Sequence, residues 1–253
     1  MKGLIKGLPE YDFMYLGDTA RVPYGNRSKE IIYEFTKQAV NFLFGKNCQI
    51  IILACNTASS DALRKIQQEY LPKNHPGKKV LGVLIPATEH AAAKTKNGKI
   101  GVIATEATIK SGAFKRELKK LNSKLKVFQN ACPLLVPIVE SGEYNSKIAD
   151  IALGKYIKPL LSKNIDTLIL GCTHYGILEN KIKRLAGKEV AIVNESKIVA
   201  EKLRNYLQRH HEIEIKLSKK GKQIFYSTDL TDKFVILGSK FMGKKINVEK
   251  VKI

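Results

Sequence analysis

Two cysteines, Cys55 and Cys172, close two segments of similar pattern in this sequence. In each segment an apolar run ends in a small residue, followed by the cysteine and then by side chains with hydroxyl, amide or imidazole groups. The apolar runs favour strands, and the residues after each cysteine favour a loop or the start of a helix, whose positive end stabilises a thiolate. A single cysteine at a strand end is more often a packing residue. Two cysteines in the same context indicate a pair of reactive thiols.

Two opposed thiols fit one kind of chemistry, which is the inversion of an α-carbon without a cofactor. One base must remove the proton from one face of the carbon, and a second acid must return a proton to the opposite face. A thiol has an ordinary pKa of about 8.5 and can serve in either role near neutral pH after a modest downward shift. We therefore expect Cys55 and Cys172 to face each other from two parts of the fold.

The other two cysteines, Cys48 and Cys132, stand apart in the sequence, and no CxxC pair occurs. All four cysteines are therefore expected to be free thiols in a reducing compartment. A structural zinc site is not expected, because no two pairs of ligands have the close spacing that such sites use. No lysine motif for a pyridoxal phosphate Schiff base stands out. We predict chemistry that uses no metal and no cofactor.

The elements that must position these thiols alternate between apolar strands and amphipathic helices, which is typical of an α/β fold with right-handed crossovers. Most of the strand-like runs are short and continuously apolar, as in parallel sheets that are buried on both faces. Helices are expected at 28–46, 61–71 and 196–207, where apolar residues recur at near-helical spacing. Strands are expected at 12–16, 49–54, 79–85, 99–104, 125–129, 167–170, 190–193 and 223–227.

The repeated strand–cysteine pattern predicts two similar domains with mainly parallel sheets that face each other across a cleft. Residues 1–96 and 197–253 would form the first α/β domain, which carries Cys55, and residues 97–196 the second, which carries Cys172. Open α/β sheets bind ligands at the carboxyl ends of their strands. Both thiols are therefore expected to point into the cleft.

The composition limits the partners. The chain has 253 residues, and its 44 Lys and Arg against 23 Asp and Glu give a formal net charge of +21. Only seven of the basic residues are arginine, the side chain that favours bidentate phosphate and guanine contacts, so no specific nucleic acid is expected. The charge instead suits a small anion such as a dicarboxylate. No membrane association and a cytoplasmic location are expected, because the sequence has neither an apolar run of roughly 20 residues nor a signal-peptide core.

Five motifs resemble those of glutamate racemases, within the wider aspartate/glutamate racemase superfamily. They are LGDTARVPYG at residues 16–25, ACNTAS at 54–59, GVLIPA at 82–87, VPIVE at 136–140 and GCTHY at 171–175. The likeness covers nearly the whole chain. The first motif and the two cysteine motifs together are specific to glutamate racemases, whereas either cysteine motif alone would indicate only the superfamily.

The resemblance implies a cofactor-independent enzyme that interconverts L- and D-glutamate and supplies D-glutamate for peptidoglycan. Cys55 and Cys172 would be its catalytic thiols, and His174 and Glu140 would assist Cys172 by hydrogen bonding and electrostatics. Glutamate would be the small-molecule partner, no metal would be bound, and a homodimer stays an open alternative. The carboxylates and ammonium of the substrate would be bound by Tyr24, Gly25, Asn56, Thr57, Thr108 and Thr173.

The sequence departs from the family pattern at three places. Glutamate racemases open with a strand that ends in Asp-Ser-Gly, whereas this sequence begins inside what would be the following helix. We therefore expect a first sheet without one internal strand, a Cys55 thiol without its orienting aspartate, and weak activity. Gly176 replaces a usual proline, and Asn194-Glu195-Ser196 replaces a usual Asp-Ser pattern near the domain junction.

Three other functions stay open on the sequence. The first is an aspartate or related amino-acid racemase, although the Pro-Tyr-Gly context of Tyr24 favours glutamate. The second is a racemase-like binding protein that is weakly active or inactive. The third is a cysteine hydrolase that uses Cys172 with His174, for which a separation of two residues is awkward without a special loop. His174, Glu140 and the turn at Tyr24 and Gly25 also have purely structural alternatives.

Overall fold

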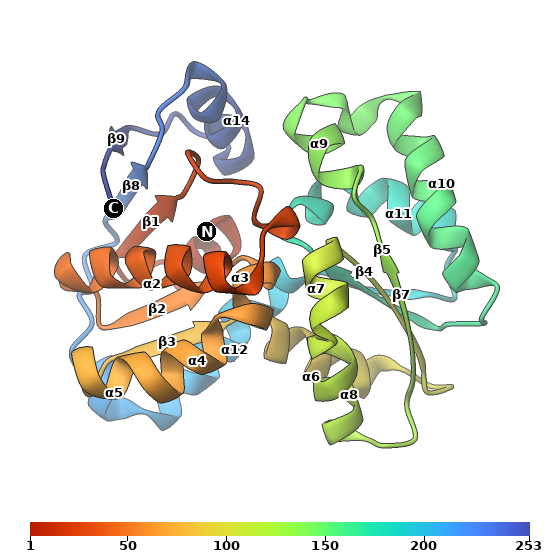
Figure 1. The fold of residues 1–253 in the computed structure, drawn as a ribbon, viewed down its shortest axis with the longest axis horizontal. Helices are drawn as coiled ribbons and strands as arrows, with labels where there is room; N and C mark the ends of the chain where they lie inside the picture. The colour runs from red at the N-terminus through yellow and green to blue at the C-terminus, as the bar shows by residue number, and fades with distance from the viewer.

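The computed structural model describes residues 1–253, except for the side chains of Lys197 and Lys233. Strands and helices alternate along the chain, and Figure 1 shows two α/β halves side by side. Every paired strand runs parallel to its neighbour, as the continuously apolar strand pattern predicts. The strands are β1 (Phe13–Gly17), β2 (Ile50–Leu53), β3 (Lys79–Gly82), β4 (Lys99–Ala104), β5 (Lys126–Ala131), β6 (Thr167–Gly171), β7 (Ala191–Val193), β8 (Gln223–Ser227) and β9 (Val248–Lys250).

The helices cover the sheets and connect successive strands. Ser28 caps the longest of them, α2, by accepting a hydrogen bond from the N–H of Ile31, as N-cap serines commonly do. The α-helices are α1 (Lys2–Gly7), α2 (Lys29–Gly45), α3 (Asn56–Asp61), α4 (Leu63–Lys65), α5 (Leu71–Asn74), α6 (Leu84–Lys94), α7 (Glu106–Ser111), α8 (Ala113–Leu121), α9 (Leu135–Glu140), α10 (Lys147–Leu161), α11 (Glu179–Ala186), α12 (Glu195–Arg209), α13 (His211–Glu214) and α14 (Asp232–Met242). Short 3₁₀ segments lie at Tyr24–Asn26, Glu143–Asn145 and Thr173–Leu178, and a π-helical segment at Ile66–Tyr70.

The four-stranded sheet has the order β5-β4-β6-β7, and its two central strands, β4 and β6, are buried almost throughout. All five residues of β6 are buried. One face of the sheet packs against a cluster that includes residues of α9, α10 and α11, and the other against a cluster that includes residues of α6 and α8. This double cover explains why its strands have no polar alternation, and it fixes the strand end that carries Cys172.

The strands of the other half form two separate parallel sheets, β1-β8-β9 and β2-β3. No ladder joins β1 to β2 among the described strands, although Cys48, just before β2, contacts Met14 of β1 with 3.6 Å between their sulfurs. Four of the five residues of β1 are only partly buried, in contrast to β6. The strand that leads to Cys55 is also less enclosed than β6, because only Ile51 and Leu53 of the four residues of β2 are buried.

The expected elements differ from the structure in two places. The apolar run 79–85 was expected to be one strand, but β3 ends at Gly82 and Leu84 already begins α6. A continuously apolar run does not distinguish a buried strand from the buried first turn of a helix. The helix expected at 61–71 is divided, because the π-helical segment at Ile66–Tyr70 separates α4 from α5.

One helix property bears on membranes. Within the described part of the chain, no helix combines the length and the apolar character that a membrane crossing requires.

Asp166, at the start of β6, ties that strand to the turn after α6. Its carboxylate accepts hydrogen bonds from the Thr95 hydroxyl at 2.6 Å and from the backbone N–H groups of Lys96 and Asn97 at 2.6 and 2.7 Å. Burial alone would raise the pKa of Asp166, but these hydrogen bonds outweigh it and lower the pKa below the ordinary value. The contribution of Asp166 to stability is therefore present above its unfolded pKa and is lost as the pH falls through the folded value.

We expect Asp166→Asn to lower the free energy of unfolding by about 1–3 kcal/mol at neutral pH, because the hydrogen bonds from Lys96 and Asn97 lose their charge and an amide nitrogen replaces Oδ1, which accepts from two hydroxyl groups. Below the folded pKa the difference from the parent should shrink, since the parent is then uncharged as well. Urea titrations at both pH values measure this. Asp150→Asn is the control, because Asp150 is 56% exposed in its ion pair with Lys181 and should change stability by less than about 0.5 kcal/mol. Equal effects of the two substitutions would contradict the prediction.

Candidate active site

Cys55 lies two residues beyond the end of β2 and is the N-cap residue of α3. The side chain of Cys55 is exposed to solvent on one side, and protein atoms surround it closely on the others. This crowding raises the pKa of the Cys55 thiol, and the backbone N–H groups of Ala58 and Thr57 oppose the rise in part. The positive end of a helix and two facing N–H groups are the environment in which a thiolate can form when a reaction demands it.

Cys172 directly follows β6 and begins the 3₁₀ segment Thr173–Leu178. The residue is 8% exposed, and burial raises its pKa strongly. Gly171 lets this strand end pack tightly, because a Cβ there would lie 2.8 Å from the ring of Phe114 and 3.1 Å from the Cβ of Ala104. The reactive atom is therefore held by a closely packed, buried strand end.

His174 and Glu140 form a chain that leads away from Cys172. The sulfur of Cys172 lies 3.7 Å from Nδ1 of His174, and Nε2 of the same ring lies 2.6 Å from Oε1 of Glu140. Glutamate accepts the hydrogen on Nε2, so the unprotonated Nδ1 faces the thiol and can take its proton. A separation of two residues, which the sequence analysis treated as awkward for such a contact, is bridged here by the 3₁₀ turn.

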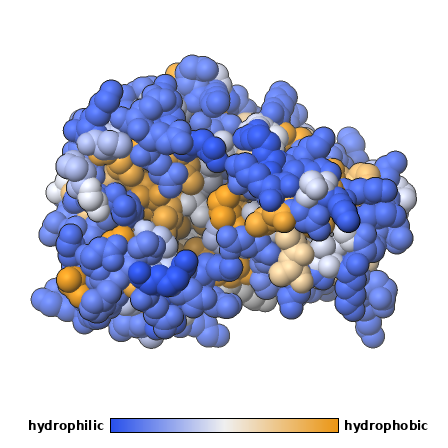
Figure 2. Space-filling model, turned by 90° about the horizontal axis from the view of Figure 1, so that it is seen from below, coloured by the Kyte–Doolittle hydropathy of each residue, from blue (hydrophilic) through white to orange (hydrophobic). Residues whose placement is uncertain are grey.

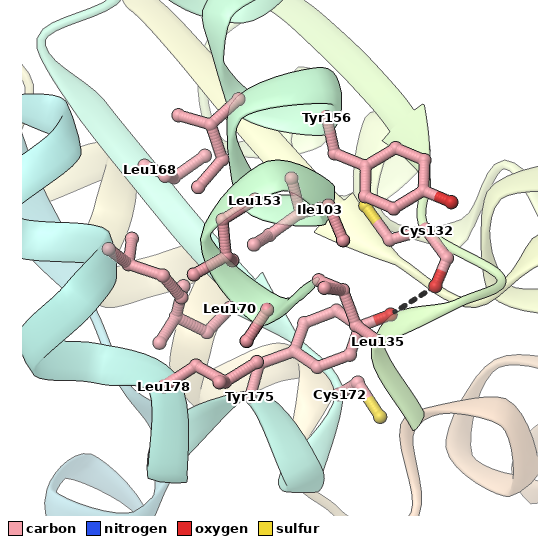
Figure 3. Packing of buried hydrophobic residues seen from close by; sticks show 14 of the residues in the cluster. Ile103, Cys132, Leu135, Leu153, Tyr156, Leu168, Leu170, Cys172, Tyr175 and Leu178 are labelled. Atoms are coloured by element: carbon pink, nitrogen blue, oxygen red, sulfur yellow. Dashed lines mark hydrogen bonds between the residues drawn. The ribbon is translucent and has the colours of Figure 1, made fainter. Parts of the chain in front are cut away.

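Tyr175 supports this turn from behind. It is fully buried, and its hydroxyl donates to the backbone carbonyl of Cys132 at 3.1 Å. Figure 3 shows the ring beside Cys172, packed among Leu135, Leu170 and Leu178. The residue next to His174 is thus anchored in the core, which restricts where the imidazole can lie.

The two thiols belong to one site. Asn56, next to Cys55, donates a hydrogen bond to Glu195 at the start of α12, and α12 packs against the 3₁₀ segment that follows Cys172. Glu195 acts on both thiols in the same direction. The carboxyl ends of β2 and β6, which lie in different sheets, are therefore brought to the same place.

Three threonine hydroxyls join the two halves beside Cys55. Oγ1 of Thr57 lies 3.0 Å from Oγ1 of Thr105 and 3.2 Å from Oγ1 of Thr108, and Thr105 donates to Thr108 at 3.0 Å. Gly25 touches the same cluster, because a Cβ there would lie 2.9 Å from the Cβ of Thr105. The structure therefore brings together Gly25, Thr57 and Thr108, which the resemblance had assigned to substrate binding, and adds Thr105.

The other expected binding residues have different surroundings. Tyr24 donates a hydrogen bond to Oδ2 of Asp18. Burial is the main cause that raises the pKa of the Tyr24 phenol, and the hydrogen bond to Asp18 is the second. Asn56 is 2% exposed and donates to Glu195 at 2.8 Å. Thr173 is exposed at the start of the 3₁₀ turn after Cys172.

Three residues of this region, Asp18, Thr105 and Glu195, were not predicted from the sequence as part of the site. Asp18 stands inside the LGDTARVPYG motif, and its position three residues before Arg21, with which it pairs at 2.8 Å, was an available signal. Thr105 precedes an acidic residue at a helix start, which is a capping pattern, and it caps α7. Glu195 had been noted only as a departure from the family pattern.

A cavity of about 320 Å³ lies elsewhere, among residues of α3, α4, α6, α8 and α12, and neither thiol lines it. Figure 2 shows apolar side chains gathered in a hollow on the face seen from below. The size of a cavity therefore does not locate the reactive groups. The positions of the two cysteines relative to each other locate the site.

Comparisons with known proteins agree with this arrangement. Residues 8–203 match the family described as Asp/Glu/Hydantoin racemase. The chain is 37% identical to a glutamate racemase of Geobacter metallireducens, over 97% of this chain and 88% of that protein. It is 40% identical to a glutamate racemase of Persephonella marina, over 97% of this chain and 89% of that protein.

Solved structures give the same result. The glutamate racemase isoform RacE1 of Bacillus anthracis superposes with a TM-score of 0.90 at 33% identity, covering 99% of this chain and 91% of that one. The glutamate racemase of Francisella tularensis, solved in complex with D-glutamate, gives 0.88 at 32% identity with the same coverage. The chain, with its two parallel-sheet halves and paired strand-end cysteines, belongs to the Asp/Glu/Hydantoin racemase family.

Proposed function

We propose that this protein interconverts L- and D-glutamate by a two-thiol acid/base mechanism without a cofactor. The observation that carries the proposal is structural: Asn56, next to Cys55, donates a hydrogen bond to Glu195 of α12 at 2.8 Å, and α12 packs against the 3₁₀ segment that follows Cys172. The relatives named as glutamate racemases support glutamate as the substrate. Production of D-glutamate for peptidoglycan follows as the role, and free cysteines suit a reducing compartment such as the cytoplasm.

Each thiol acts on one face of the α-carbon. From one enantiomer, a thiolate removes the α-proton while the opposite thiol donates its own proton to the other face, and the reverse reaction exchanges these roles. The burial of Cys172 and the close surroundings of Cys55 raise the pKa of both thiols, so each needs help to ionise. Cys172 passes its proton to Nδ1 of His174, whose resulting charge Glu140 stabilises. Cys55 depends on the N–H groups at the start of α3.

Substrate binding falls to the polar groups around these thiols. The hydroxyls of Thr57 and Thr108 are donors suited to a carboxylate. Tyr24, Gly25, Asn56 and Thr173 complete the proposed set. A dicarboxylate also suits the net charge of +21.

A cysteine hydrolase is the second candidate, because Cys172, His174 and Glu140 form a thiol–imidazole–carboxyl chain. That activity would require no second thiol. Incubation with L-glutamate, with L-aspartate and with a γ-glutamyl amide separates the candidates. We expect loss of optical activity with glutamate, measured by circular dichroism, together with little change for aspartate and no amide cleavage. Faster racemisation of aspartate, or amide cleavage without racemisation, would contradict the proposal.

The proton relay from Cys172 gives a prediction of its own. His174→Ala should lower kcat/KM by about a hundredfold or more, because the thiol loses the base that ionises it. Glu140→Gln should have a smaller effect, since the imidazole keeps a hydrogen-bond acceptor. Both enantiomers are equally stable, so kcat/KM must fall by the same factor in both directions. Initial rates from L- and D-glutamate measure this, with His211→Ala as the control because that side chain is 79% exposed. Full activity of His174→Ala would exclude the relay.

A further inference from the structure

Glu195 is a buried carboxyl group at the junction of the two halves. It begins α12, directly after the segment that leaves β7 of the four-stranded sheet, and it is 5% exposed. Its Oε2 accepts a hydrogen bond from Nδ2 of Asn56 at 2.8 Å. Asn56 is the first residue of α3 and the neighbour of Cys55, so this hydrogen bond connects the Cys55 helix with α12 (Figure 1).

The remaining oxygens of this pair are both buried acceptors. Oε1 of Glu195 and Oδ1 of Asn56 have no hydrogen-bond partner among the described residues. An ionised carboxylate has no hydrogen to donate, so it would leave both oxygens unsatisfied in a place that water does not reach. A single proton on Oε1 supplies the missing donor, because a carboxylic acid and a carboxamide can make two hydrogen bonds to each other.

We propose, building on the proposed function, that Glu195 is a neutral carboxylic acid that donates to Oδ1 of Asn56, and that this pair positions the Cys55 arm of the site. Glu195 is thus a positioning residue that acts through Asn56. The proton on Glu195 also affects the thiols. A negative charge on Glu195 would raise the pKa of both Cys55 and Cys172. A neutral Glu195 leaves Cys55 and Cys172 easier to ionise.

The surroundings of Glu195 favour the protonated form. Burial raises its pKa to about 8, and the hydrogen bond from Asn56 only partly opposes this. Helix α12 packs against α1, α6, α13 and the 3₁₀ turn after Cys172. Among the described residues, no charged group of these elements lowers the pKa of Glu195. The titratable groups on them are the Met1 amine, Lys2, Lys6, Glu89, His90, Lys94, His174, Tyr175, His211, Glu212 and Glu214.

Two substitutions distinguish a neutral acid from an ionised one. In Glu195→Gln the amide oxygen accepts from Asn56 and the amide N–H donates to it, as the neutral acid would. In Glu195→Ala the pair is lost. We expect Glu195→Ala to lower kcat/KM for glutamate racemisation on the order of tenfold, which is the scale of one unsatisfied buried polar group. Glu195→Gln should rescue this loss, and the exposed Glu201→Gln on the same helix is the control. A loss in Glu195→Gln as large as in Glu195→Ala would overturn the proposal.

A stability measurement tests the same proton without using activity. The pKa of Glu195 is higher in the folded state, about 8 against 4.5, so its stabilising contribution is full below 4.5 and is lost as the pH rises through 8. Relative to Glu195→Gln, the unfolding equilibrium constant of the parent should therefore rise about tenfold for each pH unit in that window. A constant difference between the two proteins would overturn the proposal. If the parent shows no racemisation, the proposed function fails, while this measurement still reports the state of Glu195.

Discussion

Replacing either Cys55 or Cys172 by serine is expected to lower kcat/KM for racemisation by more than about a hundredfold in both directions. Every turnover uses both thiols, one as a base and one as an acid, so the loss of either blocks the complete reaction. A serine hydroxyl is a far weaker acid than a thiol and does not replace it near neutral pH. Each substitution should also leave the other thiol in place, because the strands that lead to Cys55 and Cys172 lie in different sheets.

The half-reactions separate the two thiols. A glutamate analogue with a chloride on Cβ loses the α-proton to one thiolate and then expels chloride, so that elimination requires only one base. We expect Cys55→Ser to retain elimination from one enantiomer and Cys172→Ser from the other, as followed by chloride release. Cys48→Ser is the matched control, because Cys48 contacts Met14 and lies outside the proposed mechanism. Full racemisation by either active-site variant would contradict the two-thiol account.

Tyr175→Ala is expected to reduce the free energy of unfolding by about 3–5 kcal/mol, the largest stability effect that we predict. Tyr175 is among the largest fully buried side chains, and it lies in the cluster that packs under the four-stranded sheet (Figure 3). Removing the ring leaves a cavity, and the carbonyl of Cys132 loses its hydrogen bond. The cavity should also loosen the turn that carries His174.

Tyr175→Phe isolates the hydroxyl from the ring. It keeps the packing and loses only the hydrogen bond to Cys132, so we expect a cost of about 1–2 kcal/mol. Urea unfolding of both variants, followed by circular dichroism, gives the two differences. If Tyr175→Ala costs no more than Tyr175→Phe, the ring does not support the turn in the way described here.

Much of the fold could be predicted from the sequence, because strands buried on both faces leave a clear signature. All eight expected strands are present, and those at 99–104 and 223–227 have the bounds that the apolar pattern gave. The parallel α/β class and the relationship to glutamate racemases are confirmed. The domain boundaries at residues 96 and 197 stay predictions.

Other features depend on pairing in three dimensions, which a linear pattern does not contain. The short edge strand β9 was missed, because two of its three residues, Glu249 and Lys250, are charged and exposed. The division of the first half into two sheets is a property of strand neighbours. The helix break at 66–70 was missed although Pro72 follows it. A proline removes the hydrogen bond to the residue four positions earlier, here Gln68.

The residues of the site also fall into two groups, those that a local sequence motif marks and those that only the fold brings together. Cys55, Cys172, His174 and Glu140 stand in motifs whose residue types indicate chemistry. Glu195 stands 139 residues from Asn56, so no local pattern could reveal their hydrogen bond. Only the fold brings that carboxyl group beside the Cys55 helix.

The origin of the proton that reaches the α-carbon tests the central claim most directly. L-Glutamate is incubated with the protein in deuterium oxide. Each enantiomer is analysed by mass spectrometry under initial-rate conditions, before about one tenth of the L-glutamate has reacted. Two opposed thiols predict that the D-glutamate formed carries deuterium at the α-carbon, while the unreacted L-glutamate still carries its original hydrogen. D-Glutamate that retains the original hydrogen would mean that one group moves the same proton between the two faces, and it would contradict the roles assigned to Cys55 and Cys172.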